Sequence, residues 1–143
     1  MLVNKLNHLL ANLVVEYHKL QNFHWYIKGC DFFTVHAKLE DYYNDINKAV
    51  DEVAESILML EGKPLASLQE FAAHASVKEA EAQFRQSDVI LAEVAKDYNL
   101  LLEEVIDIKK AADAEENFII SAMMDDYIRN FTKAVWMLKQ LKA

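Results

Sequence analysis

Residues 31–64 read DFFTVHAKLEDYYNDINKAVDEVAESILMLEGKP, and this stretch decides the fold. Its apolar side chains recur at alternating steps of four and three residues, which is the spacing of one face of an α-helix. Asp31 can cap the start of this pattern, and Gly62 and Pro64 end it. The pattern predicts one helix of about thirty residues. Its apolar positions are Val35, Leu39, Tyr42, Ile46, Ala49 and Val53.

The same rhythm predicts further helices on both sides of this stretch. A first helix runs from near the start of the chain to Gly29, and a short helix occupies about residues 65–73 of the connection that follows Pro64. Residues 91–108 form a third long helix, and the polar segment 109–117 leads into a fourth. The pattern positions are Leu6, Leu10, Leu13, Tyr17, Leu20, His24 and Ile27, then Leu91, Val94, Tyr98, Leu101, Val105 and Ile108, and last Phe118, Phe131, Trp136, Leu138 and Leu141.

Length and composition agree with a bundle of long helices. A chain of 143 residues, 53% of them hydrophobic, has the size of one domain. Two glycines and one proline are too few for the frequent turns of a β-sandwich, a β-barrel or a low-complexity chain. We therefore predict an all-α protein with a single domain at residues 1–143. It is a four-helix bundle with a short extra helix in the crossover between the second and third helices.

Charge and cysteine content exclude several classes of protein. The net charge of −8 has the wrong sign for binding the phosphates of nucleic acids, and it favours cations. The single Cys30 cannot form a disulfide within the chain, which fits a reducing compartment. No apolar run reaches the ~18 residues of a membrane span, and no signal-peptide cleavage site follows the first apolar stretch. We expect a cytoplasmic protein with no membrane partner.

Two pairs of potential metal ligands stand on the second helix. His36 and Glu40 are four residues apart and share a face, and Asp51 and Glu55 repeat this arrangement. All four lie within an arc of about 100°, but the two pairs are about 22 Å apart along the axis. A metal–ligand bond spans only about 2 Å. One chain alone cannot close such a site.

Two copies of the chain could close it. If two second helices pack antiparallel about a two-fold axis near Asp45 and Ile46, the first pair of one copy faces the second pair of the other. His24 lies six residues before Cys30 and His36 six residues after it, so the two imidazoles reach similar heights on neighbouring helices. Two imidazoles and three carboxylates suit iron or another first-row divalent ion better than a thiolate metal.

Each of these residues also has an ordinary structural explanation. His24 lies on the apolar face and could be a hydrogen-bonded core histidine. Asp51 and Glu55 could belong to a solvated helix face, and His36, one position off the apolar face, could be exposed. The joint register of all five ligand-type residues is what favours a metal site.

The motifs around the two histidines are similar to those of a known family. They are His24-Trp25-Tyr26-Ile27-Lys28-Gly29, Phe32-Phe33-Thr34-Val35-His36 and Asp51-Glu52-Val53-Ala54-Glu55. With them the chain resembles the Dps miniferritins, the DNA-protection-during-starvation proteins, over nearly its whole length. The resemblance implies a ferritin-like bundle and a hollow dodecameric homo-oligomer. It also implies a di-iron ferroxidase site shared between two subunits at each two-fold interface.

The resemblance assigns the iron-binding and catalytic residues. His24 and His36 come from one subunit, and Asp51 and Glu55 come from its neighbour. The family usually has Asp at the position of Glu40, and the added methylene moves this carboxylate relative to the second iron position. The implied activity is oxidation of Fe(II), with hydrogen peroxide favoured over dioxygen, and storage of the ferric mineral inside the shell. This activity would protect against oxidative stress, since two irons supply both electrons to one peroxide.

Acidic residues near the start of the last helix have two explanations. By resemblance, Asp113, Glu115 and Glu116 would line an iron-uptake pore at a three-fold axis. The alternative is an acidic first turn that complements the helix dipole. A ferritin-type site inside each bundle is not supported, because none of the five histidines has Glu three residues before it.

The family name leaves DNA binding open. Family members that bind DNA typically use a flexible basic tail, whereas this chain has only Lys5 ahead of His8, with Lys139 and Lys142 near its other end. Repeated over a dodecamer, the net charge of −8 should repel duplex phosphate, so DNA binding is not expected. Two alternatives remain. One is a DNA-coating or scaffolding shell with a metal site weakened by Glu40, and the other is a monomeric helical adaptor.

Overall fold

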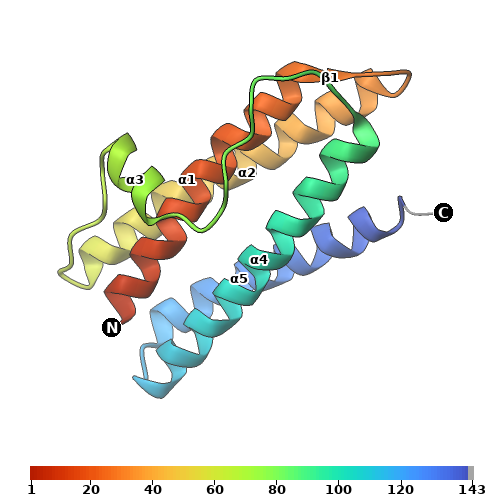
Figure 1. Cartoon of the computed structure of the whole chain (residues 1–143). Coiled ribbons are helices and arrows are strands. Elements are labelled where there is room, and N and C mark those ends of the chain that lie inside the picture. The colour runs from red at the N-terminus through yellow and green to blue at the C-terminus, as the bar shows by residue number, and fades with distance from the viewer. Residues whose placement is uncertain (142–143) are drawn as a thin grey trace.

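The computed structural model describes residues 1–141, and Lys142 therefore lies outside the described part. Four long helices form two antiparallel pairs, α1 with α2 and α4 with α5 (Figure 1). The predicted four-helix bundle with a short helix in the crossover is confirmed. The helices are α1 (Leu2–Tyr26), α2 (Phe32–Met59), α3 (Leu68–His74), α4 (Ser87–Ala114) and α5 (Phe118–Lys139), and the strands are β1 (Ile27–Lys28) and β2 (Arg85–Gln86).

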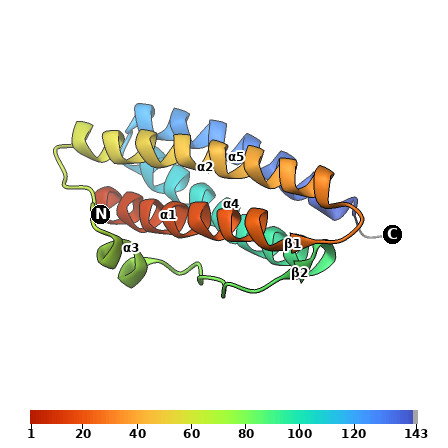
Figure 2. The ribbon, with the colours of Figure 1, turned by 90° about the horizontal axis from the view of Figure 1, so that it is seen from above.

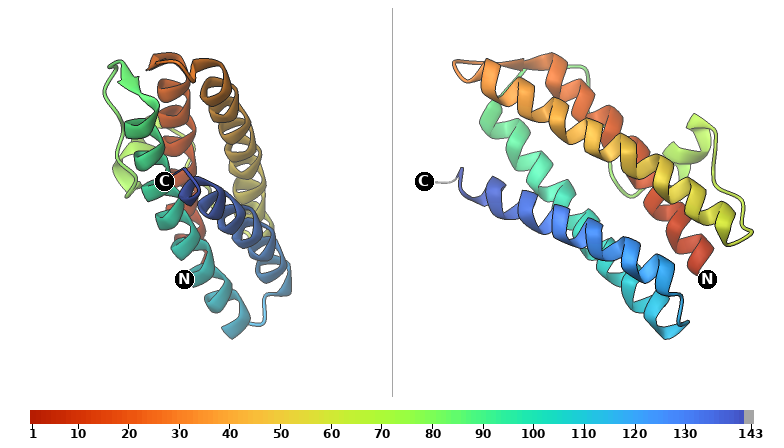
Figure 3. Two further views of the ribbon diagram at one scale, coloured as in Figure 1. Left: turned by 90° about the vertical axis from the view of Figure 1, so that its right-hand side faces the viewer. Right: turned by 180° about the vertical axis from the view of Figure 1, so that it is seen from behind.

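The helices are arranged in two layers, with α1 and α4 in one and α2 and α5 in the other (Figure 2). α1 packs on α2 and also contacts α4. α2 and α5 diverge toward the end of the bundle where α5 ends (Figure 3), and a groove of about 790 Å³ lies between them. Most of the apolar positions predicted from the sequence are buried between the layers. Phe118, Trp136 and Leu141 are exposed, so their assignment to the apolar face of the last helix is wrong.

The core holds α1 and α2 in a fixed register. Leu20 and Phe23 of α1 and Leu39 and Ile46 of α2 are almost completely buried. Burying each such side chain contributes roughly 1.5–3 kcal/mol relative to leaving it exposed. The end of α1 and the start of α2 are thereby placed side by side.

The first helix ends at Tyr26, so the prediction that it continues to Gly29 is wrong. Ile27 and Lys28 leave the helix and pair in parallel with Arg85 and Gln86. Ile27 fits the helical pattern because it is buried, and a buried strand residue gives the same signal as a buried helix residue.

Asp31 stands at the N-cap of α2, but its side chain does not cap the helix. Its carboxylate accepts a hydrogen bond from the Ser87 hydroxyl, which joins the start of α2 to the start of α4. α4 continues to Ala114, so two thirds of the polar segment predicted as a connection, residues 109–114 of 109–117, are helical.

The short crossover helix begins at Leu68, three residues later than predicted, and a capping box sets its start. The Ser67 hydroxyl accepts from the backbone of Glu70, and the Glu70 carboxylate accepts from the backbone of Ser67. The two reciprocal bonds satisfy backbone groups that the first turn leaves free.

Candidate metal centre

His24 and His36 form a stacked pair where α1 ends and α2 begins. Nδ1 of His24 lies 2.7 Å from the carbonyl oxygen of His36, and Nδ1 of His36 lies 2.7 Å from the carbonyl oxygen of His24. The rings are nearly parallel, with their centroids 3.6 Å apart. The sequence prediction that the two imidazoles reach similar heights is confirmed.

The reciprocal hydrogen bonds fix the tautomer of both rings. A carbonyl oxygen can only accept, so each Nδ1 carries a hydrogen and donates it. In the neutral imidazole the proton-free nitrogen is then Nε2, which is left with a lone pair. This is the arrangement that orients histidines toward metals in proteins.

Glu40 places a carboxylate beside this pair. Its Oε1 lies 3.6 Å from Nε2 of His24, too far for a hydrogen bond but close enough for both atoms to ligate one ion. His24 is buried, His36 is half-buried, and the Glu40 side chain is 53% exposed. One side of the group is therefore open to a partner or a ligand.

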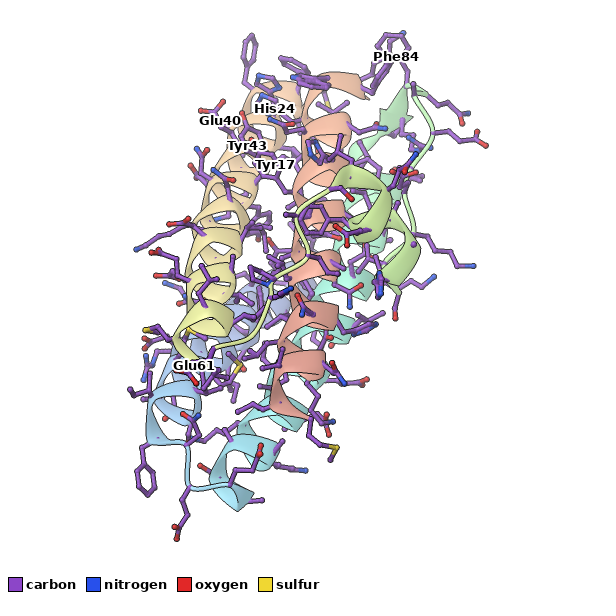
Figure 4. The ribbon with its side chains drawn as sticks, turned by 90° about the vertical axis from the view of Figure 1, so that its left-hand side faces the viewer. Tyr17, His24, Glu40, Tyr43, Glu61 and Phe84 are labelled. Carbon is purple, nitrogen blue, oxygen red and sulfur yellow. The ribbon has the colours of Figure 1, made fainter. Side chains whose placement is uncertain are left out.

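Two tyrosines complete the surroundings of His24 and lie with it between α1 and α2 (Figure 4). The Tyr43 ring meets the His24 ring edge-on at 5.3 Å, and Tyr17 meets Tyr43 edge-on at 5.7 Å. Desolvation, followed by the Glu40 carboxylate, raises the pKa of Tyr43, so this phenol stays neutral. Tyr43 is not among the residues predicted for the site, although its position two helical turns after His36 puts it on the same face.

Asp51 and Glu55 are not brought to the histidines within one chain. Both are exposed on α2, farther along the helix. Among residues 1–141, no three His, Cys, Asp or Glu side chains come close enough to hold a metal ion. A site completed by a second copy stays a prediction.

Comparison with known proteins identifies the family. A ferritin-like domain model matches residues 3–142. General stress protein 20U of Bacillus subtilis (strain 168) is 38% identical over 138 residues, which cover 96% of this chain and 94% of that protein. DNA protection during starvation protein 2 of Bacillus anthracis is 34% identical over 137 residues, with 96% and 93% covered. The chain belongs to the Dps family of ferritin-like proteins.

A solved Dps structure has the same fold as this Dps-family chain. The DPS protein from Vibrio cholerae O1 matches with a TM-score of 0.96 at 36% identity, covering 99% of this chain and 89% of that one. It is described as a member of a broad superfamily of ferritin-like diiron-carboxylate proteins. The family resemblance expected from the histidine motifs is confirmed. No helix within residues 1–141 has the length and apolar character needed to cross a bilayer.

The acidic residues expected at a pore of the Dps shell lie before the last helix. Asp113 is in the last turn of α4, and Glu115 and Glu116 form the turn between α4 and α5. The first turn of α5 contains no acid, and the Asn117 side chain caps it. The alternative explanation, an acidic first turn of the last helix, is therefore wrong. All three acids are exposed, as lining a pore requires, and the pore stays a prediction.

A second cluster of charged residues lies inside the bundle of this Dps-family chain. Nζ of Lys19 lies 2.7 Å from Oδ2 of Asp97 and 3.0 Å from Oε1 of Glu93. Glu16 is fully buried, and within residues 1–141 neither of its carboxyl oxygens has a geometrically well-formed hydrogen bond. Burial, followed by the charge of Asp97, raises the pKa of Glu16. This cluster is not predictable from the sequence, because nothing in the local pattern pairs α1 with α4.

Proposed function

We propose that this chain oxidises Fe(II) at sites shared between two copies and stores the ferric product inside a homo-oligomeric shell. The observation that carries the proposal is the stacked pair of His24 and His36, whose Nδ1 atoms are bonded to backbone carbonyls, with Nε2 of His24 3.6 Å from Oε1 of Glu40. Neutral imidazole and carboxylate are ligands that suit iron. Membership of the Dps family supports the same activity.

The exposed face of α2 supports antiparallel pairing of two copies. Phe33, Glu40, Asp51 and Leu58 follow each other at helical spacing on one face, and all four are exposed. The midpoint of Phe33 and Leu58 and the midpoint of Glu40 and Asp51 both fall between Asp45 and Ile46. A two-fold axis at that point would set Phe33 against Leu58 and Glu40 against Asp51.

The apolar ends of this face give the pairing a driving force. Phe33 is 85% exposed and Leu58 is 58% exposed, and Trp25 beside His24 is 64% exposed. Large apolar side chains left exposed at both ends of one helix face are typical of a surface that a partner covers. Burying them in a partner would bring the partner's Asp51 and Glu55 to the histidines of this chain.

The residues of the shared site would bind two Fe(II) ions as substrates. Each iron gives one electron, so the pair reduces one hydrogen peroxide to the oxidation level of water: 2 Fe²⁺ + H₂O₂ + 2 H₂O → 2 FeOOH + 4 H⁺. His24 and His36 hold the ions without rearranging, because their backbone hydrogen bonds already orient them. Protection of DNA, for which several relatives are named, would follow from the removal of iron and peroxide.

Anaerobic Fe(II) mixed with hydrogen peroxide tests the proposal. The ferric product is followed by absorbance, and the wild type is compared with a variant that carries both His24→Ala and Asp51→Ala. The proposal predicts that the variant forms ferric mineral much more slowly, and that dioxygen replaces peroxide poorly. Equal mineral formation by the two proteins would leave a scaffolding shell as the better explanation.

A further inference from the structure

Ser76, His8 and Glu104 form a hydrogen-bonded chain on the side of the bundle away from α2. Ser76 lies in the crossover after α3, His8 lies in the first half of α1, and Glu104 lies on α4. Nε2 of His8 is 2.8 Å from Oγ of Ser76, and Nδ1 of His8 is hydrogen-bonded to Oε2 of Glu104. A hydroxyl, an imidazole and a carboxylate are thus connected in that order.

The carboxylate fixes the state of the imidazole. Glu104 accepts, so Nδ1 of His8 carries a hydrogen, and in the neutral ring Nε2 is then free to accept the Ser76 proton. A hydroxyl in contact with a base that a third group orients is the arrangement of an activated nucleophile.

Asn12 holds both ends of this chain in place. Its Nδ2 donates to Oε1 of Glu104 at 2.8 Å. Its Oδ1 accepts from the backbone nitrogens of Ser76 at 2.7 Å and Val77 at 3.0 Å. Asn12 is completely buried, so the acid and the loop that carries the hydroxyl share one rigid support. Supporting contacts of this kind are what a functional group needs to stay in position.

A groove of about 510 Å³ lies directly beside the hydroxyl and is lined by both Ser76 and His8. Leu100 and Ile108 form an apolar wall of the groove. Glu103 and Asp107 make its rim acidic. Lys5 also lines the groove, and its Nζ is paired with Oδ2 of Asp107 at 2.6 Å. The groove therefore suits a small acyl compound that is uncharged or cationic, and it repels an anionic one.

We propose that Ser76, His8 and Glu104 form a nucleophilic site that cleaves small uncharged or cationic carboxylic esters. Oγ of Ser76 attacks the ester carbonyl carbon while Nε2 of His8 takes the hydroxyl proton. The bond from that carbon to the alcohol oxygen breaks, and the proton passes to the departing alcohol. Water then gives a proton to the same nitrogen, attacks the acyl-serine and releases the carboxylic acid, which restores Ser76.

Asn4 supplies the donor that such a reaction needs at the carbonyl oxygen. It stands one helical turn before His8, lines the same groove, and its amide has no hydrogen-bond partner among the described residues. A side-chain amide can stabilise the oxyanion that forms on attack. Asn4→Ala should therefore slow acylation while the hydrogen bonds of His8 remain.

Esterase assays and covalent labelling test this site in the assembled protein. The probes are p-nitrophenyl acetate, its anionic hemisuccinate analogue and a fluorophosphonate, all with EDTA present so that bound metal cannot hydrolyse the ester. The expected result is a burst of nitrophenol with the acetate, much slower cleavage of the anionic ester, and probe mass on Ser76 in the digested protein. Ser76→Ala removes the burst and the label, and His8→Gln slows acylation about a hundredfold.

Matched variants separate catalysis from a purely structural role of the network. Thr132→Ala removes an exposed hydroxyl of α5, and His18→Ala removes an exposed histidine of α1. Both should acylate Ser76 like the wild type. Labelling that survives Ser76→Ala, or acylation of Ser76 that is unchanged by His8→Gln, would overturn the proposal. Iron oxidation is expected to be the same in all these variants, so the test does not depend on the metal site.

Discussion

His24 and His36 orient each other: each Nδ1 lies 2.7 Å from the carbonyl oxygen of the other residue. The end of α1 and the start of α2 are thus joined through the same two side chains that present Nε2 to a ligand. Their protonation pattern and their spacing follow from one pair of backbone hydrogen bonds. The proposed metal binding at this end of the bundle would therefore need little rearrangement of the chain.

Glu40→Gln should weaken metal binding while keeping the shape of the side chain. Oε1 of Glu40 lies 3.6 Å from Nε2 of His24, so the longer acid of this chain still reaches the imidazole. Without the negative charge, we expect the affinity for Zn(II) to fall about tenfold or more, a loss of about 1.4 kcal/mol. Isothermal titration of the assembled protein measures it.

Glu61→Gln is the control, because Glu61 is an exposed acid at the far end of α2 (Figure 4). It should bind Zn(II) like the wild type. If Glu40→Gln and Glu61→Gln titrate alike, Glu40 is not a ligand.

Gly62→Ala should destabilise the protein, chiefly by crowding the side chain of Val3. An added Cβ would lie 2.8 Å from Cγ1 and 2.9 Å from Cγ2 of Val3, closer than real contacts allow. Crowding of this kind costs about 1–3 kcal/mol. The free energy of unfolding in urea measures the cost. In a Val3→Ala background the same change should cost less than half as much, and equal costs in both backgrounds would contradict the steric explanation.

The long helices could be predicted because each carries an unbroken apolar face. Ile27 shows the limit of this signal. Its burial fits the helical rhythm, but its backbone pairs with Arg85, and nothing in the polar sequence around Arg85 indicates a strand. Asp31 shows another limit, since its hydrogen-bond partner is Ser87, a residue distant in sequence.

Glu16 should make the folded protein less stable as the pH rises. The folded chain raises the pKa of Glu16 above its ordinary value of 4.5, because the group is buried and lies near Asp97. The folded state therefore holds this proton more tightly than the unfolded chain. The contribution of protonated Glu16 to the free energy of unfolding is fully present below pH 4.5. It is lost as the pH rises toward the folded pKa, by at most about 1.4 kcal/mol per pH unit.

The glutamine side chain of Glu16→Gln cannot ionise, so this variant should not lose stability in this way as the pH rises. Thermal unfolding of the wild type and of Glu16→Gln between pH 5 and about 8 gives the difference in Tm at each pH. We expect the Tm of the variant to increase relative to the Tm of the wild type as the pH rises. Glu115→Gln, at an exposed position, should show no such trend. A difference that is constant or shrinks with rising pH would show that Glu16 is ionised in the folded protein.

Duplex DNA should not bind to the assembled protein. The net charge is −8, and two of the lysines on the described surface already pair with acids, Lys5 with Asp107 at 2.6 Å and Lys109 with Asp125 at 2.9 Å. Repulsion of phosphate should therefore dominate. A gel shift at low salt and neutral pH measures it, and a variant with a Lys-rich N-terminal extension is the positive control. Retarded duplex with the unextended protein would contradict this prediction.

The two histidines of the candidate site could be predicted because both lie six residues from Cys30 at the tip of a helical hairpin. In an antiparallel hairpin, residues at equal distances from the tip lie side by side, so His24 and His36 come together. Tyr43 could have been found from the same face of α2. The contacts of Glu16 with Asp97 and of His8 with Ser76 could not, since they join segments whose alignment depends on the packing of the whole bundle.

Complementation between two inactive variants tests most directly whether the site is shared between copies. One variant carries His24→Ala and His36→Ala, and the other carries Asp51→Asn and Glu55→Gln. Each alone should oxidise Fe(II) with peroxide at a small fraction of the wild-type rate. Assembled together in equal amounts, half of the two-fold pairs are mixed and each mixed pair has one intact site, so about a quarter of wild-type activity should return. Mixed assemblies that stay as inactive as the separate variants would contradict a site shared between two subunits.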